Sequence, residues 1–253
     1  MTGSTTQNKL SKIIGILIWF VIWQIGAMTV DNIYILPSPL LTLRTLLALK
    51  DSPDFFISIG TTLYRVFLGF FLSVGIGTIL GLLSGLNHWV HDFVKPFVVV
   101  VRSTPVISVI LMIAIWVHTD AVPVVIAFLM GFPIIWLSAY EGLCQTDSQK
   151  LEMAKSFNVK KRNIMLGIYL PSIRPYLLTG IISALGISWK VTVAAEVISF
   201  PKAAIGSRLF ESKLYVETSE VFAWTIVVVS LSFIFEYLVK SQLKKLNKGA
   251  YNA

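Results

Sequence analysis

Four charged residues lie inside otherwise apolar runs of this sequence, and these are the positions most able to do chemistry. They are Arg102, Arg174, Lys190 and Glu196. A charge at the centre of a bilayer costs on the order of 2.5 to 3.5 kcal/mol on insertion scales, so such side chains mark solute contacts or buried ion pairs. Lys190 and Glu196 are six residues apart, about 9 Å along a helix and on different faces. We therefore expect them not to pair with each other.

The sequence around these charged residues allows more than one role for each of them. We place Arg102 and Arg174 near the cytoplasmic ends of their spans, where long side chains reach the headgroups. Lys190 is predicted either to attract an anion or to form a structural ion pair. Glu196 is predicted near the outer end, where it either braces a gate or lies at the interface.

Hydrolytic chemistry and metal binding find no support in the sequence. His88 and His91 have an i, i+3 spacing, yet no Cys, Asp or Glu cluster completes a metal site, and we interpret both as interfacial. Cys144 is the only cysteine and is interpreted as a packing residue. There is no G-x-x-x-x-G-K-[ST] loop and no Ser/His/Asp arrangement. We predict no catalytic residue, no metal site and no cofactor in this chain.

The elements that position these residues are membrane helices. Of 253 residues, 55% are hydrophobic and 13% charged, a balance that favours a bilayer as the solvent. A bilayer crossing needs roughly 20 apolar helical residues. The sequence predicts a single all-α membrane domain over residues 1–253, with six spans at residues 13–30, 60–86, 96–117, 121–142, 164–197 and 221–239. Residues 118–120 predict a tight hairpin, and the fifth span is long enough to require a bend or an interfacial part.

Charge placement gives an orientation. An uncleaved anchor fits the first span better than a signal peptide, because its apolar core is long and no A-x-A site follows. With cytoplasmic termini, the inner segments hold most of the basic residues, namely Lys9, Lys12, Lys95, Lys150, Lys155, Lys160, Lys161, Arg162, Lys240, Lys244, Lys245 and Lys248. The outer segments hold the sparser set Arg44, Lys50, Arg65, Lys202, Arg208 and Lys213. The net charge of +8 is thus spread over membrane flanks and does not predict a nucleic-acid partner.

Small residues recur every fourth position in the second span. They are Gly69, Ser73, Gly77, Gly81 and Gly85. Such a ridge lets another helix approach closely where lipid supplies no hydrophobic driving force. The fifth span repeats the pattern at Gly180, Ala184, Ser188 and Thr192. Helix packing is the favoured interpretation, and lining of a channel is the alternative.

The polar segment at residues 144–163 predicts a short helix followed by a turn. Asp147 or Ser148 is a candidate N-cap, and Glu152 near the helix start is favoured by the helix dipole. Asn158 tolerates the positive φ that a sharp turn requires. Pro171 removes a backbone donor and is expected to bend or offset the start of the fifth helix. On composition alone, a solvated basic connector is the alternative.

The spacing across residues 152–171 resembles the cytoplasmic coupling loop of ABC importer permeases, whose pattern is Glu-Ala-Ala, a Gly, then Ile-x-Leu-Pro. The matching residues are Glu152, Ala154, Ile168, Leu170 and Pro171, with Asn158 at the position of the family's Gly. Further segments resemble the nitrate/sulfonate/taurine type of permease: Leu36-Pro37-Ser38-Pro39, Arg65-Val66-Phe67-Leu68-Gly69-Phe70, Arg102-Ser103-Thr104-Pro105, Trp189-Lys190-Val191-Thr192-Val193-Ala194-Ala195-Glu196 and Ile205-Gly206.

The resemblance implies a six-span type I importer fold in a prokaryotic cytoplasmic membrane. It implies two cytoplasmic ABC ATPase subunits that hold ATP and Mg, a second permease subunit in a homodimer, and an extracytoplasmic solute-binding protein. Contact with that binding protein is a further alternative for Glu196, beside bracing a gate or lying at the interface. The implied solute is a small nitrate-, sulfonate- or taurine-like anion or a related nutrient. Candidate pathway or gate residues are Arg102, Ser103, Thr104, Trp189, Lys190, Thr192 and Glu196.

Two other classes of protein remain as alternatives at this point. An ion-gradient-driven secondary transporter is expected to contain inverted repeats with interrupted helices. A membrane scaffold without transport activity shares the small-residue ridges but has no need of the spacing across residues 152–171.

Overall fold

The protein is a bundle of helices. The computed structural model describes residues 4–250, and all regular structure in that range is helical. The helices are α1 (Ser4–Val30), α2 (Pro39–Lys50), α3 (Pro53–Leu86), α4 (His88–Ser103), α5 (Val106–Trp116), α6 (Val122–Cys144), α7 (Ser148–Ser156), α8 (Lys161–Ile164), the π-helical segment η1 (Met165–Tyr169), α9 (Leu170–Ser199), α10 (Ile205–Leu214) and α11 (Thr218–Ala250).

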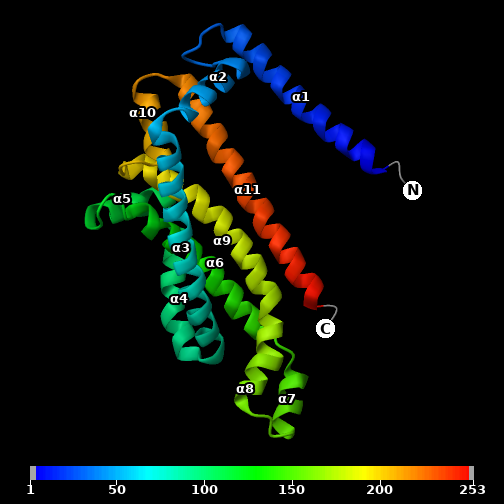
Figure 1. Cartoon of the computed structure of the whole chain (residues 1–253). Coiled ribbons are helices and arrows are strands. Elements are labelled where there is room, and N and C mark those ends of the chain that lie inside the picture. The colour runs from blue at the N-terminus through cyan, green and yellow to red at the C-terminus, as the bar shows by residue number, and fades with distance from the viewer. Residues whose placement is uncertain (1–3, 251–253) are drawn as a thin grey trace.

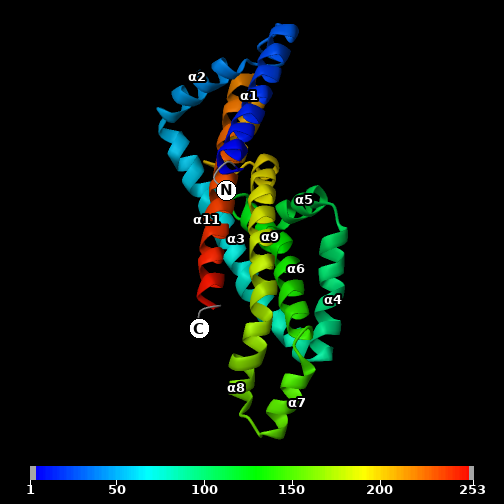
Figure 2. The same cartoon turned by 90° about the vertical axis from the view of Figure 1, so that its right-hand side faces the viewer.

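Different segments of the chain lie at the two ends of the bundle (Figures 1 and 2). The turn between α3 and α4 and the hairpin of α7 and α8 lie at one end. The turn between α5 and α6, the loop between α9 and α10, and helix α2 lie toward the other. Helix α1 leans away from the bundle, and Trp23 fixes its upper part by stacking on Phe222 at 5.6 Å and donating a hydrogen bond to the Pro37 carbonyl at 3.0 Å.

The central helix, α6, packs between α3 and α9. The small residues of α3 make this packing close: a Cβ at Gly69 would lie 2.5 Å from the Ala127 Cβ, and one at Gly81 would lie 2.6 Å from the Trp136 carbonyl oxygen. Gly77 and Gly85 face Ile135 and Leu143 of α6 in the same way, and the Ser73 hydroxyl donates to the Phe128 carbonyl at 2.9 Å. The ridge on α3 is thus a helix-packing surface.

Close packing through small residues also joins α6 to α9. A Cβ at Gly180 would lie 2.3 Å from the Ser138 hydroxyl oxygen, and Ser188 donates to the Ala127 carbonyl at 3.3 Å. Ala184 is fully buried beside Phe70 and Ile135. Three helices therefore approach each other through small side chains, and this core holds the charged residues of α3 and α9 in place.

The third predicted span, residues 96–117, is not one continuous helix, and this prediction is wrong. The chain is helical from His88 to Ser103, then bends by 109° into α5. Pro105 lacks a backbone donor and disfavours helical geometry at the preceding residue, and Thr104 is extended with φ −85° and ψ 133°. The expected hairpin at residues 118–120 is a turn, but one of its arms is only the short helix α5.

Four described helices are long and apolar enough to span a membrane, and a fifth span results if the bent α4 and α5 pair is counted. The first predicted span corresponds to the shorter apolar stretch Leu17–Val30 of α1. The fifth runs without a break as one 39-residue helix, Lys161–Ser199, whose first turns project beyond the bundle. That projection, rather than a sharp bend, accommodates its length. The side chains of Lys9, Lys12, Lys240 and the later lysines lie outside the part of the chain that the structure describes.

Candidate functional site

The hairpin of α7 and α8 projects beyond the end of the bundle (Figures 1 and 2). Asp147 caps α7, because its carboxylate accepts a hydrogen bond from the Gln149 N–H at 2.9 Å. Ala154 is buried, whereas Glu152 is exposed beside Met153 and Phe157, which are 61% and 76% exposed. Residues four apart lie on the same face of a helix. The tip of the molecule thus presents two large apolar side chains next to one carboxylate.

The turn after α7 has the geometry expected at Asn158. Its φ is 49°, in the left-handed region that Asn tolerates better than most residues. The Val159 N–H donates to the Ala154 carbonyl at 3.0 Å, which closes the end of α7 and directs the chain into α8. Asn158 therefore does here what a glycine does at a helix C-terminus.

The other loop residues lie where the hairpin joins α9. Leu170 and Pro171 are exposed and Ile168 is half-buried. Pro171 has no N–H to donate to the Gly167 carbonyl, and the turn before it is π-helical, with the Leu170 N–H donating to the Met165 carbonyl. The missing donor at Pro171 is thus accommodated by one extra residue in this single turn, and the helix is not sharply bent.

A second site of charge lies in the core toward the opposite end of the bundle. The Glu196 side chain on α9 is 0% exposed, and its Oε1 lies 3.1 Å from the Arg65 Nη1 on α3. Its Oε2 accepts hydrogen bonds from the Thr62 hydroxyl at 2.9 Å and from the Gly206 N–H at 3.2 Å. Glu196 therefore pairs with Arg65, not with Lys190.

Arg65 also holds two loops. Its Nη2 lies 3.1 Å from the Asp120 Oδ1 in the turn between α5 and α6. The guanidinium also donates to the carbonyls of Lys202 and Ala203 in the loop between α9 and α10, at 3.2 and 3.3 Å. This role of Arg65 was not predicted, because the residue was counted with the outer loop charges. The signal was present, since Arg65 falls inside the predicted span at residues 60–86.

Three of the pathway candidates lie at the break between α4 and α5. Arg102 and Ser103 are exposed, and the Thr104 hydroxyl donates to the Val100 carbonyl at 2.8 Å. The placement of Arg102 near the start of its span is wrong, because α4 begins at His88 and Arg102 is in its last turn. Arg174 lies near the start of α9, as expected, and is half-buried.

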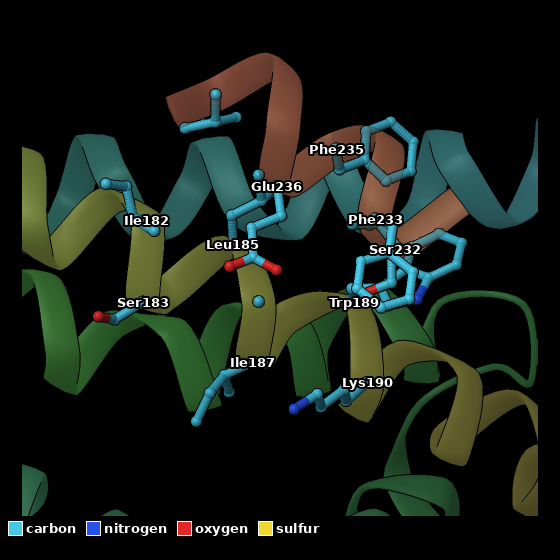
Figure 3. Close-up of a pocket in the computed structure, with 13 residues that line it drawn as sticks. Ile182, Ser183, Leu185, Ile187, Trp189, Lys190, Ser232, Phe233, Phe235 and Glu236 are labelled. Carbon is cyan, nitrogen blue, oxygen red and sulfur yellow. The ribbon is translucent and has the colours of Figure 1, made fainter. Parts of the chain in front are cut away.

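The candidates on α9 separate into two faces. Trp189 and Thr192 are buried within this chain, and Thr192 donates to the Ser188 carbonyl at 2.7 Å, whereas Lys190 is exposed. A cavity of about 460 Å³ lies between α9 and α11, with mostly apolar walls. Figure 3 shows Glu236 of α11 extending toward α9, while Ile187 and Lys190 point away from α11. A cavity of this lining suits an apolar group better than a hydrated anion.

Comparison with known proteins identifies the family to which the chain belongs. Residues 73–248 match the family described as binding-protein-dependent transport system inner membrane component. The chain belongs to this family. Members are permease subunits of ABC importers, and ATP hydrolysis takes place in a partner ATPase. This inner-membrane component is therefore a multi-pass, non-catalytic subunit that works with an ATPase and a solute-binding protein, which sets aside the secondary-transporter and scaffold alternatives.

Individual relatives of the inner-membrane component agree over nearly the whole chain. SsuC of Bacillus subtilis (strain 168), named as a permease protein for aliphatic sulfonates transport, is 27% identical over 90% of this chain and 83% of its own length. The taurine transport system permease protein TauC of Escherichia coli (strain K12) is 23% identical over 88% and 83%.

Solved structures share the fold. An inward-facing MetNI methionine ABC transporter matches with a TM-score of 0.63 and 16% identity, covering 76% of this chain and 94% of that one. An amino acid ABC transporter crystallised with histidines gives a TM-score of 0.64 and 16% identity, covering 80% and 97%. The predicted type I importer fold is thereby confirmed, although the count of six spans is not.

Proposed function

We propose that this chain, paired with a second copy, forms the transmembrane pathway of an importer for a small sulfonate-type anion. Two cytoplasmic ATPase subunits, which hold ATP and Mg, bind the α7–α8 hairpin, and an extracytoplasmic binding protein delivers the solute. Both termini then lie in the cytoplasm of a prokaryotic cell. The observation that carries the proposal is the exposed hairpin, which presents Met153 and Phe157 beyond the bundle.

The hairpin is suited to bind a protein partner. Large apolar side chains exposed to water are stabilised by a complementary apolar groove, and a neighbouring carboxylate adds orientation. Glu152 supplies that carboxylate and Lys155 lies on the next turn. Because η1 and α9 continue from the hairpin as one helix, a force on α7 is transmitted along α9 to its far end.

The anion assignment is supported by two exposed cations and by the names of the relatives. Arg102 and Lys190 are exposed within apolar stretches of α4 and α9. A cation in such a position is stabilised by water in a pathway or by an anionic solute. SsuC and TauC are named for sulfonates and taurine, which carry a sulfonate anion.

The proposed binding of an ATPase to the α7–α8 hairpin is tested by co-purification. Tagged chain is purified from native membranes in mild detergent, and a Walker-motif ATPase is expected in about equal amount. Glu152→Lys reverses the charge beside Phe157 and is expected to lose the ATPase while the chain still inserts. Glu217→Lys makes the same change at an exposed position toward the opposite end of the molecule and serves as the control. Equal ATPase recovery in both variants would contradict the proposed docking site.

The joint between hairpin and α9 gives a second test. Pro171→Ala restores the missing N–H, so the π-helical turn is expected to close to α-helix and rotate the hairpin relative to α9. Coupled ATP hydrolysis and uptake should fall while insertion is retained. Pro175→Ala, four residues further along α9, is the matched control. Unchanged coupling in Pro171→Ala would show that the π turn has no role in transmission.

The proposed transport of a sulfonate-type anion is tested in proteoliposomes that contain the permease, its ATPase and its binding protein. ATP-dependent uptake of radiolabelled taurine or a short alkanesulfonate is expected, and uptake of methionine is not. Lys190→Gln should reduce uptake without loss of the assembled complex. Uptake of an uncharged or cationic solute in preference to sulfonates would overturn the anion assignment.

A further inference from the structure

Arg65 is shared between two carboxylates that differ in burial. Glu196 is 0% exposed and Asp120 is 49% exposed, while the Arg65 side chain between them is 8% exposed. Glu196 alone neutralises the arginine. It is further held by the Thr62 hydroxyl and the Gly206 N–H. The pair of Arg65 and Glu196 is therefore electrically complete without Asp120.

Asp120 is the partner that can leave at low cost. A buried charge that loses its partner is strongly destabilised, whereas a half-exposed carboxylate regains water. The other oxygen of Asp120, Oδ2, lies 3.8 Å from the Nδ1 of His118, which is largely exposed. Breaking the contact between Arg65 and Asp120 thus leaves no buried charge unpaired.

The turn that Asp120 fixes joins the short helix α5 to the buried start of α6 at Val122. Helix α5 meets α4 at a 109° bend at Thr104 and Pro105. One side of α5 packs along its length against α6 and α9, through Ile110 and the neighbouring Val106, Val109 and Ile113, and the opposite side is exposed. Helix α5 therefore has an extended joint at one end, an apolar packing surface along one side, and the ion pair of Asp120 just beyond its other end.

We propose that Asp120 is a releasable latch on α5: Arg65, held by Glu196, fixes the turn between α5 and α6, and release of Asp120 lets α5 swing about Thr104 and Pro105. The proposal rests on the proposed function in one respect, namely that the swing accompanies opening of the transport pathway. Arg65 acts here as a positioning residue, because it fixes α5 through Asp120 and does not itself line the exposed surface.

The test is a distance measurement on the full chain. Spin labels are placed at Ile115→Cys on α5 and Leu214→Cys on α10, both exposed, in a Cys144→Ser background. The protein is reconstituted in lipid nanodiscs with an excess of unlabelled chain, so that distances within one copy dominate. Asp120→Asn keeps the shape and removes the charge, and it is expected to raise the population at long distance about 1.4- to 5-fold, as loss of a half-exposed ion pair predicts.

Two further variants serve as controls. Asp54→Asn removes the carboxylate of a second exposed ion pair, whose Oδ2 lies 2.6 Å from the Arg208 Nη2. It should leave the distribution unchanged, and Asp120→Glu should restore the wild-type distribution. An Asp120→Asn distribution identical to wild type overturns the latch. A lowered melting temperature with an unchanged distribution does the same, because the ion pair is then only structural.

The assembled transporter gives a separate readout. With its ATPase bound, Asp120→Asn is expected to hydrolyse ATP faster than wild type when the binding protein is absent. Unchanged basal hydrolysis would contradict a link between the latch and the transport cycle. If no ATPase binds the wild-type chain, the proposed function fails, while the nanodisc distances still decide whether the latch exists.

Discussion

Arg65 and Glu196 show how a charge is accommodated between apolar helices. Each brings a charge that is costly to bury alone, and each is satisfied by the other and by polar groups of the adjoining loop. Removing only one partner leaves an uncompensated charge, so the two side chains contribute to stability as a unit.

Arg65→Met is expected to destabilise the protein by about 3 to 5 kcal/mol, because Glu196 is left buried without its cation. The double variant Arg65→Met and Glu196→Met should recover most of that loss, since two apolar side chains replace the pair. Thermal unfolding in detergent, followed by size-exclusion chromatography, measures both. A double variant as unstable as the single one would show that the pair is not coupled.

Gly81 and Gly75 provide a matched pair on α3. A Cβ at Gly81 would lie 2.6 Å from both the Ala139 Cβ and the Trp136 carbonyl oxygen, whereas a Cβ at Gly75 meets nothing within 4 Å. Gly81→Ala is expected to cost about 1 to 3 kcal/mol of overpacking, and Gly75→Ala to gain up to about 1 kcal/mol of helix propensity. Thermal unfolding of both variants checks the difference, and equal melting temperatures would contradict the packing of α3 on α6.

Among the elements, the α7–α8 hairpin depends on one backbone conformation. Asn158→Gly is expected to leave the hairpin unchanged, because Gly adopts a φ of 49° freely. Asn158→Val is expected to cost about 1 to 2 kcal/mol locally. Hydrogen–deuterium exchange of the α7 amides measures the loss of order. Equal exchange in the two variants would mean that the turn does not fix α7.

The sequence predicts some elements well because their cause is local or periodic. The four-residue spacing of small residues on α3 reflects contact with α6 along its length, and the cap at Asp147 and the turn at Asn158 depend only on nearby backbone. The break at Thr104 and Pro105 was missed because the apolar residues on both sides of the Arg102–Pro105 segment were counted as one span. Hydropathy reports burial in lipid or protein, and a bent pair of helices has the same composition as a straight one.

The partner of Glu196 could not be identified from spacing, for a different reason. Arg65 and Glu196 are 131 residues apart, and no short-range pattern links them. Likewise, Trp189 and Lys190 are neighbours in sequence but occupy different faces of α9, about 100° apart. Which face is covered depends on α3 and α11, so the burial of Trp189 and Thr192 follows from packing alone.

At the scale of the whole molecule, the order of the helices places the connecting turns at two opposite ends. The α3–α4 turn and the α7–α8 hairpin lie together, and the turns before α6 and α10 lie toward the opposite end (Figure 1). The basic cluster Lys150, Lys155, Lys160, Lys161 and Arg162 falls on the hairpin. Because basic segments are retained on the cytoplasmic side, the hairpin end is expected to face the cytoplasm.

Cys144 makes that orientation measurable without altering the hairpin. It is the only cysteine of the sequence and it ends α6 just before α7. Its interpretation as a packing residue is wrong, because its side chain is exposed. A membrane-impermeant maleimide is expected to leave it unlabelled in intact cells and to label it in inside-out vesicles. Leu214→Cys in a Cys144→Ser background, exposed on α10, should give the reverse pattern. Labelling of Cys144 in intact cells would place the hairpin outside, where no ATPase can reach it, because the ATP that drives the transporter is in the cytoplasm.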